Sequence, residues 1–346
     1  MVIRRLLSRA LLAIAVVAVP LGVTVAPALT EPAHAATCPG QTLDIPPTAG
    51  TPNMSYPFGI AVDASGHIYV ADGSTNTIYK YDSTGHQTMT IPSTAATPNL
   101  GDPLGLALDS SDNIYVVSRD NGDVVKFNSS GHQVMEIPPT AGTPNMSEPV
   151  GLAVDSHGNI YVGDEGTNTV YKFNATGHQT MAIPSTAATP NLNDPDGVGV
   201  DAAGNIYVGN AFPGSVVKFD SSGTQVMNIP STAGTPNLSD PEGVAIDALG
   251  NIYVGTQGGA VYQFDSTGHQ NWVLQSTAAT PNFEAPVGVA LDASANLYIA
   301  DKYNSNVYAF CTGVVLPTTT TTTVSGSTTT TAAAAQAVST EPAFTG

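Results

Sequence analysis

The chain has 346 residues and a formal charge of −18, and only 10% of its residues are Asp, Glu, Lys or Arg, against roughly 25% in an average soluble domain. Nine basic residues over this length are too few for the Lys/Arg surface that neutralises phosphates, which argues against nucleic acid as a partner. The 34 Gly and 26 Pro residues are too many for a helical protein and favour short strands joined by turns.

The N-terminal segment has the pattern of a secretory signal peptide. Three arginines precede an unbroken apolar run, Ala10 to Val19, and a small-x-small cleavage site follows at Ala33-His34-Ala35. We therefore expect residues 1–35 to be removed on secretion. The alternative, a membrane anchor, needs roughly 20 apolar residues, and Pro20 interrupts the run. No second apolar stretch approaches that length, so we expect no membrane span in the mature chain.

A seven-residue pattern, Pro-x-Gly-x-x-x-Asp, repeats along the middle of the chain. It begins at Pro57, Pro103, Pro149, Pro195, Pro241 and Pro286, with spacings of 46, 46, 46, 46 and 45 residues. A constant period in the 40s with several short strands per unit is typical of a propeller blade. The sequence therefore predicts one all-β domain, a six-bladed β-propeller, over residues 36–315.

Each repeat is predicted to form four strands, which the third repeat illustrates. The first strand covers Gly151–Asp155, and the second, Ile160–Val162, follows a tight turn. The third covers Val170–Phe173 and the fourth Gln179–Ile183. These runs are β-branched and aromatic, and Gly, Asn and Pro separate them, which leaves little room for a helical interpretation.

The repeat resembles a known blade motif. Pro195-x-Gly-x-x-x-Asp201-x-x-Gly-Asn-Ile-Tyr-Val208 and Tyr161-Val-Gly-Asp164-x-x-x-Asn168-x-Val170-x-Lys-Phe173 are similar to the NHL repeat of six-bladed propellers. The resemblance covers about residues 38 to 313. It implies that the first strands line a central channel and that the loops entering them share a face with the loops after the second strands. It implies less about function, because similar propellers include ligand-binding sensor domains, hydrolases and lyases.

The two ends of the repeat region complement each other. The sixth repeat stops at Cys311-Thr-Gly313 without a fourth strand, whereas Gln41–Asn53 matches Gln133–Asn145 nearly residue for residue. We therefore expect the N-terminal strand to complete the last blade and leave no open sheet edge.

The same alignment places the only two cysteines across the break in the closing blade. Cys38 takes the place of Thr84, and Cys311 takes the place of Asp82, on either side of the turn between the third and fourth strands. In a secreted protein this placement predicts a Cys38–Cys311 disulfide that holds the ring shut, the alternative being two free thiols.

Four carboxylates gather near the expected channel mouth, and two of them break the repeat pattern. The residue between Pro and Gly is apolar in four repeats, but it is Asp196 and Glu242 in two adjacent ones, where Asp194 and Asp240 precede the proline. Such a group could bind a divalent cation through oxygen ligands or a cationic ligand. The alternative is that Asp before Pro serves the turn and that the extra acids are solvated.

The loop after the second strand gives one more candidate. Asp72, Asp164 and Asp301 recur there and are expected to brace the loop through Asx-type hydrogen bonds. In the second repeat the same loop carries Arg119. Arg119 is a candidate contact for an anionic group, or simply pairs with neighbouring charges.

Catalysis is the alternative function. The resemblance extends to streptogramin lyases and gluconolactonase-like propellers, which use a metal in the channel and place His, Glu and Asn at its mouth. Here the histidines of the repeats fall in turns away from the channel mouth, and the sequence contains no Gly-x-Ser-x-Gly or His-Glu-x-x-His motif. We expect a non-catalytic recognition or scaffolding module with no catalytic residues and no cofactor, apart from a divalent cation if the acidic group binds one.

The C-terminal segment, residues 316–346, is rich in Thr and Ala and is predicted to be disordered. Its last residues, Pro342–Gly346, resemble the sorting signals of Gram-positive surface proteins, although the leading Leu is replaced; the alternative is a chance match. These features predict a monomer that is secreted or associated with the cell wall. Its expected partner is a protein, a cell-wall polymer or a small ligand.

Overall fold

The computed structural model describes residues 40–49, 53–94, 100–141, 145–185, 192–231, 238–276 and 282–311. The predicted signal peptide, the C-terminal segment with Pro342–Gly346, and Cys38 lie outside these residues. Within the described ranges, no helix is long and apolar enough to cross a membrane.

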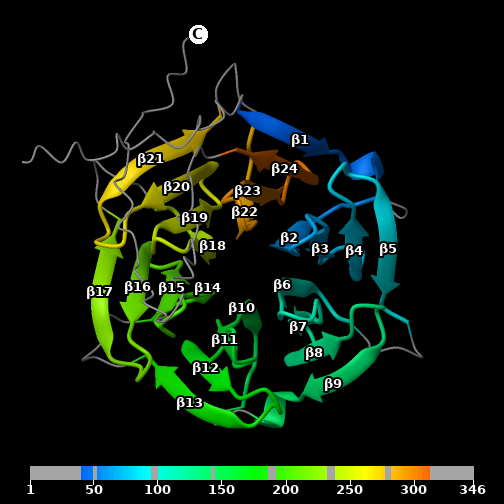
Figure 1. Ribbon diagram of the computed structural model, residues 1–346. Helices are drawn as coiled ribbons and strands as arrows, with labels where there is room; N and C mark the ends of the chain where they lie inside the picture. Colours follow the sequence, from blue (N-terminus) through cyan, green and yellow to red (C-terminus); the bar gives the residue numbers. More distant parts are fainter. Residues whose placement is uncertain are drawn as a thin grey trace, which may run out of the picture. The chain divides into compact units, whose positions relative to one another are not determined.

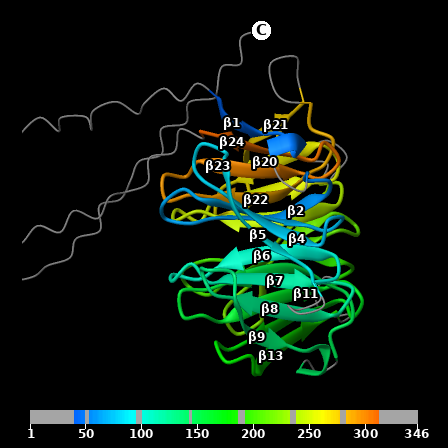
Figure 2. The same ribbon diagram turned by 90° about the vertical axis from the view of Figure 1, so that its right-hand side faces the viewer.

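The described residues form six four-stranded antiparallel sheets arranged as blades around a central axis (Figure 1). In the third blade the order from the centre outward is β10 (Pro149–Val154), β11 (Ile160–Asp164), β12 (Thr169–Phe173) and β13 (Gln179–Pro184). The side view in Figure 2 shows the neighbouring sheets that contain β22, β2 and β6 stacked on one another. The predicted all-β six-bladed propeller is confirmed.

The other blades repeat this order. Blade 1 comprises β2 (Pro57–Val62), β3 (Ile68–Asp72), β4 (Thr77–Tyr81) and β5 (Gln87–Pro92). Blade 2 comprises β6 (Pro103–Leu108), β7 (Ile114–Ser118), β8 (Asp123–Phe127) and β9 (Gln133–Ile137). Blade 4 comprises β14 (Pro195–Val200), β15 (Ile206–Asn210), β16 (Ser215–Phe219) and β17 (Gln225–Pro230). Blade 5 comprises β18 (Pro241–Ile246), β19 (Ile252–Thr256), β20 (Ala260–Phe264) and β21 (Gln270–Gln275).

The sixth blade is closed by the N-terminal strand. Its sheet order is β1 (Gln41–Ile45), β24 (Asn306–Phe310), β23 (Leu297–Asp301) and β22 (Pro286–Leu291). β1 and β24 pair antiparallel, which confirms the predicted closure. The backbone N–H of Cys311 donates to the Gly40 carbonyl at 3.3 Å. The disulfide stays a prediction, because Cys38 is not among the described residues. Two short 3₁₀ turns, η1 (Pro47–Ala49) and η2 (Pro139–Ala141), follow β1 and β9.

The repeated Asp is a turn residue rather than the end of the first strand. In blade 3, Asp155 lies just beyond β10, and its Oδ1 accepts the backbone N–H groups of His157 and Asn159, both at 2.9 Å. Its Oδ2 accepts the Tyr161 hydroxyl at 3.0 Å. The Lys172 ammonium lies 5.0 Å from the centre of the Tyr161 ring, a cation–π contact. These contacts among Asp155, Asn159, Tyr161 and Lys172 explain why Asp, Asn, Tyr and Lys recur at fixed spacings in the repeat.

The cores lie between blades, and the Pro-x-Gly pattern allows the blades to approach each other. Tyr161 and Ile183 of blade 3 pack with Val198 and Phe219 of blade 4. A Cβ at Gly151 would collide with the main-chain carbonyl of Asp196 in the next blade. Glycine is therefore required where the innermost strands come together.

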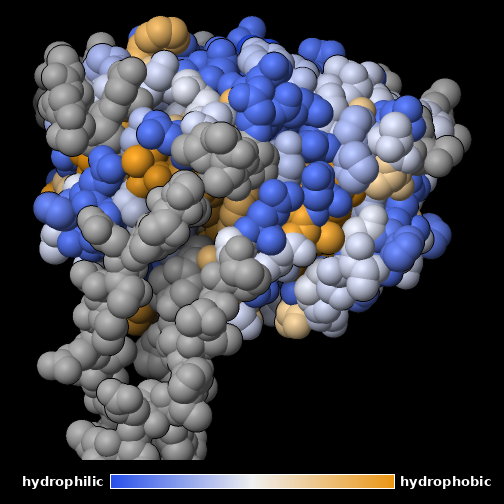
Figure 3. Space-filling view, turned by 90° about the horizontal axis from the view of Figure 1, so that it is seen from above, coloured by the Kyte–Doolittle hydropathy of each residue, from blue (hydrophilic) through white to orange (hydrophobic). Residues whose placement is uncertain are grey.

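The outer rim is mostly hydrophilic on the side that Figure 3 shows. Figure 3 looks at the edge of the ring that carries β1 and β21, where pale and blue residues cover most of the coloured surface and hydrophobic residues are scattered. Hydrophilic residues thus supply much of this surface.

Candidate ligand-binding site

All five candidate residues of the sequence line one cavity at the channel mouth. The cavity has a volume of about 200 Å³, and its walls include Arg119, Asp194, Asp196, Asp240 and Glu242. The inner strands and the loops on one face of the ring contribute these residues. The structure therefore brings the predicted set together.

Five residues from each of two sets of six equivalent positions line the cavity, Val287 and Gly73 being the exceptions. The strand ring is the residue between Pro and Gly in each innermost strand: Phe58, Leu104, Val150, Asp196, Glu242 and Val287. The loop ring is the first residue after each second strand: Gly73, Arg119, Glu165, Ala211, Gln257 and Lys302. Every blade contributes one residue to the strand ring and one to the loop ring. A side-chain donor in the loop ring can therefore reach a carboxylate in the strand ring.

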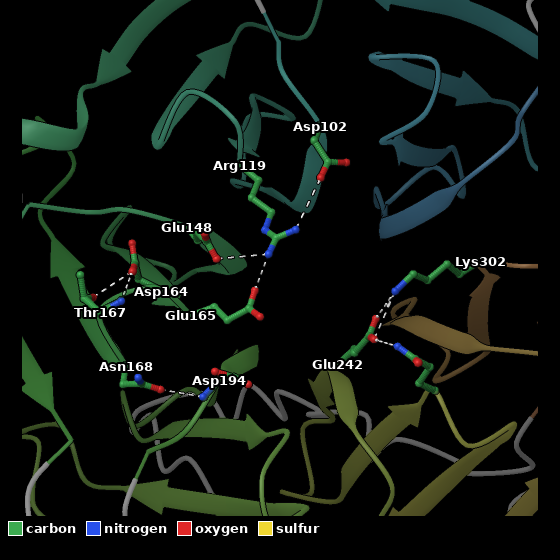
Figure 4. Close-up of polar contacts among 11 residues, drawn as sticks. Asp102, Arg119, Glu148, Asp164, Glu165, Thr167, Asn168, Asp194, Glu242 and Lys302 are labelled. Atoms are coloured by element: carbon green, nitrogen blue, oxygen red, sulfur yellow. Dashed lines mark hydrogen bonds and ion pairs between the residues drawn. The ribbon is translucent and has the colours of Figure 1, made fainter.

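The aspartates before the prolines serve the turn as well as the cavity. Asp102, Asp194 and Asp240 have φ of 48°, 56° and 56°, the left-handed region that Asp and Asn tolerate better than other side chains. The N–H of Asp194 donates to Asn168 Oδ1 of the preceding blade at 2.7 Å (Figure 4). The turn thus explains why aspartate occupies these positions, although their side chains line the cavity.

The predicted Asx-type brace is present in the loop after the second strand. Asp164, the last residue of β11, accepts the N–H of Thr167 at 2.8 Å through Oδ1 (Figure 4). Its Oδ2 accepts the N–H of Ser147 at 2.8 Å. The Asp164 carboxylate therefore connects the loop after β11 to the loop before β10, and its role is structural.

Arg119 is held among carboxylates. Its guanidinium lies 2.8 Å from Glu165, 3.3 Å from Glu148 and 4.0 Å from Asp102 (Figure 4). Burial opposes the guanidinium charge, but the charges of Glu165, Glu148 and Asp102 outweigh it and raise the pKa of Arg119. The structure thus shows the neighbouring-charge pairing that the sequence offered as the alternative to an anion contact.

Glu242 is satisfied by two donors of the loop ring. The Lys302 ammonium lies 3.2 Å from both carboxylate oxygens (Figure 4). Gln257 donates to Oε1 at 2.6 Å. Glu242 and Lys302 are each only 6% exposed, so this is a buried ion pair. Burial lowers the pKa of Lys302, but Glu242 and Tyr56 together more than offset it and the pKa is raised. For Glu242 the balance is the opposite, because burial outweighs the charge of Lys302 and raises the pKa of its carboxyl.

Asp196 has the equivalent position in the next blade but lacks such donors. It is 7% exposed, and its Oδ1 has no hydrogen-bond partner among the described residues. Burial, reinforced by the charges of Glu242, Glu165, Asp240 and Asp194, raises its pKa to about 9. A buried carboxyl without a partner is costly, and this one faces the cavity.

The loop ring explains why Asp196 lacks a donor. The loop-ring residue of its own blade is Ala211, which has no side-chain donor. The loop-ring residue of the following blade is Gln257, which donates to Glu242. Neither loop-ring residue therefore supplies a donor to the carboxyl of Asp196, a residue that lines the cavity.

The described residues do not fit a metal centre. No three His, Cys, Asp or Glu side chains among them converge closely enough to hold a metal ion. None of the described histidines lines the cavity. Although the acids of the predicted cluster share one cavity, they do not form a preorganised ligand set for a divalent cation.

Several cavity residues were not predicted from the sequence. Asp102, Glu165, Gln257 and Lys302 all join the wall of the cavity. Three of them, Glu165, Gln257 and Lys302, directly follow a second strand. The charge at this repeat position varies from blade to blade, and this variation is the sequence feature that could have identified them. Phe212, 58% exposed, adds an aromatic ring to the wall.

Comparisons with known proteins agree with this architecture. The family model described as NHL repeat matches residues 54–81 and 146–173. The chain is a six-bladed β-propeller that contains NHL repeats. A second model, described as strictosidine synthase-like, N-terminal, matches residues 231–264. No curated protein matches the chain.

Solved structures share the fold at low sequence identity. A streptogramin B lyase is 15% identical with a TM-score of 0.54, over 75% of this chain and 94% of that one. A virginiamycin B lyase from Staphylococcus aureus is 16% identical with a TM-score of 0.54, over 75% and 80%. A gluconolactonase from Xanthomonas campestris is 16% identical with a TM-score of 0.57, over 74% and 86%. The propeller is thus similar to those of lyases and lactonases, and at this identity the likeness concerns the fold.

Proposed function

We propose that this NHL-repeat propeller is a secreted, non-catalytic recognition module that binds a cationic group at its channel mouth. The observation that carries the proposal is Asp196, a buried carboxyl whose Oδ1 has no partner and which lines the cavity. A hydrogen-bond donor that carries a positive charge would satisfy this carboxyl and offset the cost of its burial.

The charges around Asp196 favour a cation. The cavity wall also holds Asp102, Glu165, Asp194, Asp240 and Glu242. Its two basic side chains, Arg119 and Lys302, are both paired with carboxylates. A concave site with excess negative charge concentrates cations and repels anions.

The size of the cavity limits what can enter. A volume of about 200 Å³ is below the roughly 300–1,000 Å³ of pockets that enclose drug-sized ligands. The site suits a small amine or the cationic end of a larger partner, such as a protein side chain or an amino group of a wall polymer.

The enzymatic alternative is a lyase or lactonase, the classes of the similar solved structures. A metal-dependent reaction of that kind would need ligands that the described residues do not bring together. The geometry therefore favours recognition over catalysis as the function of this cavity.

The proposal is tested by calorimetric titration of the purified protein with n-propylammonium chloride, with sodium propanoate as the anionic counterpart. We expect saturable binding of the ammonium at one site and none of the propanoate. Asp196→Asn should weaken binding at least tenfold. The matched control is Glu136→Gln on the exposed outer strand β9, which removes one charge away from the cavity and should leave affinity unchanged. Equal affinity in Asp196→Asn and wild type, or preference for propanoate, would overturn the proposal.

A further inference from the structure

The strand ring divides the cavity into an apolar and an acidic part. Phe58, Leu104 and Val150, in three consecutive blades, line the same cavity as Asp196 and Glu242. Phe58, Leu104 and Val150 also belong to one apolar cluster, together with Val287 of the sixth blade. The wall therefore changes from hydrocarbon to carboxylate around a single ring of equivalent positions.

The chain places an alkylammonium of its own in this environment. The Lys302 side chain is four methylenes ending in an ammonium, which lies 5.0 Å from the centre of the Tyr56 ring and 5.2 Å from that of Phe58. The same ammonium pairs with Glu242 at 3.2 Å. Carboxylate, aromatic faces and hydrocarbon thus already hold one alkylammonium here.

We propose that the ligand is an amphiphilic alkylamine, whose ammonium binds Asp196 while its hydrocarbon chain lies on Phe58, Leu104 and Val150. This inference rests on the proposed function and specifies its ligand class. Phe58, Leu104 and Val150 are themselves only 4–6% exposed, so the gain comes from the alkyl chain of the ligand, which leaves water when it enters the cavity beside them.

The cavity volume sets the length of the chain. The cavity of about 200 Å³ limits how many methylenes can lie beside Phe58, Leu104 and Val150. Each methylene placed on the apolar wall should raise affinity about fourfold. The gain should end near n-hexylammonium, when the cavity is full.

The test is a calorimetric series from methylammonium to n-octylammonium on the purified protein. We expect the affinity to rise about fourfold per methylene up to five or six carbons and then level off. Val150→Ser should reduce this increment while methylammonium still binds. The matched control is Val134→Ser on β9, a valine that is 55% exposed and away from the cavity, and it should leave the increment unchanged. Leu104→Ser is a second variant, used if Val150→Ser fails to fold.

The outcomes separate the two proposals. If all members bind with equal affinity and lose it in Asp196→Asn, the cationic site stands and the alkyl preference is wrong. The alkyl preference is also wrong if the gain in affinity per methylene persists in folded Val150→Ser and Leu104→Ser proteins. If no member binds, the proposed function itself fails.

Discussion

Asp196 and Glu242 occupy the same position in adjacent blades, yet of these two carboxylates only that of Glu242 is bound by donors among the described residues. Lys302 and Gln257 contact Glu242 at 3.2 and 2.6 Å, whereas the Oδ1 atom of Asp196 has no partner within the described part of the chain. The difference arises from two loop-ring residues: Ala211 in the blade of Asp196 has no side-chain donor, and Gln257 in the next blade donates to Glu242. Two carboxylates that look alike in the sequence thus have different roles.

The Glu242–Lys302 pair should be strongly coupled energetically. Lys302→Met leaves a buried carboxylate without its cation, which should lower the free energy of unfolding by about 3–5 kcal/mol. The double variant Glu242→Gln/Lys302→Met removes both charges and should regain most of that loss. Urea denaturation of the two single variants, the double variant and wild type measures the coupling. Simple additivity of the two single effects would contradict a buried pair.

Amine binding should depend on pH through Asp196. Its pKa is raised to about 9, so at neutral pH the carboxyl is protonated and must lose its proton to pair with a cation. The dissociation constant of n-propylammonium should therefore fall about tenfold per pH unit between pH 6 and 8 and level off near pH 9. Titrations in two buffers of different ionisation enthalpy measure the released proton. A dissociation constant that is the same at pH 6 and pH 8 would refute the role of Asp196.

Asp123 should destabilise the fold at neutral pH. It is 8% exposed with an unpartnered Oδ1, and burial together with the charge of Glu136 raises its pKa from 3.8 to about 6. Because the folded state binds the proton more tightly, stability falls as pH rises from 3.8 to about 6. Asp123→Thr, with the residue found at the equivalent Thr77 and Thr169, should gain about 1–3 kcal/mol at pH 7. At pH 4 the gain in thermal or urea denaturation should vanish, and an equal gain at both pH values would show that ionisation is not its cause.

The closing blade should be held by the Cys38–Cys311 disulfide. The pairing of β1 with β24 and the hydrogen bond from Cys311 to Gly40 bring the flanking segments together. The chain-entropy contribution for so long a loop reaches roughly 5 kcal/mol as an upper figure. Intact mass after alkylation without reductant should show no modified thiol, and Cys311→Ser should lower the melting temperature. Alkylation of two thiols in the unreduced secreted protein would disprove the bond.

Much of the fold could be predicted because the same sequence pattern recurs in each of the six repeats. The period, the turns and the missing fourth strand of the last repeat led to six blades and to closure by β1. Strand limits were less accurate: the first strand begins at Pro149 rather than Gly151, because a bulge after the proline lets it pair with Asp164. The side chain of Asp155 closes the turn, which removes it from the strand.

The site was predicted in part. Asp196 and Glu242 are visible as departures from an apolar repeat position, and both line the cavity. Their difference depends on which loop residue reaches which carboxylate, a relation between blades that no local pattern contains. The pairing of Arg119 with Glu148 and Glu165 has the same cause, because these partners follow it by 29 and 46 residues.

The central claim is that Asp196 receives a cation from outside the chain. A crystal structure of the protein soaked with n-butylammonium tests it most directly. The account predicts the ammonium nitrogen within hydrogen-bond distance of the Asp196 carboxyl and the butyl chain against Leu104 and Val150. A cavity that stays free of the amine at saturating concentration, or an ammonium bound away from Asp196, would contradict it.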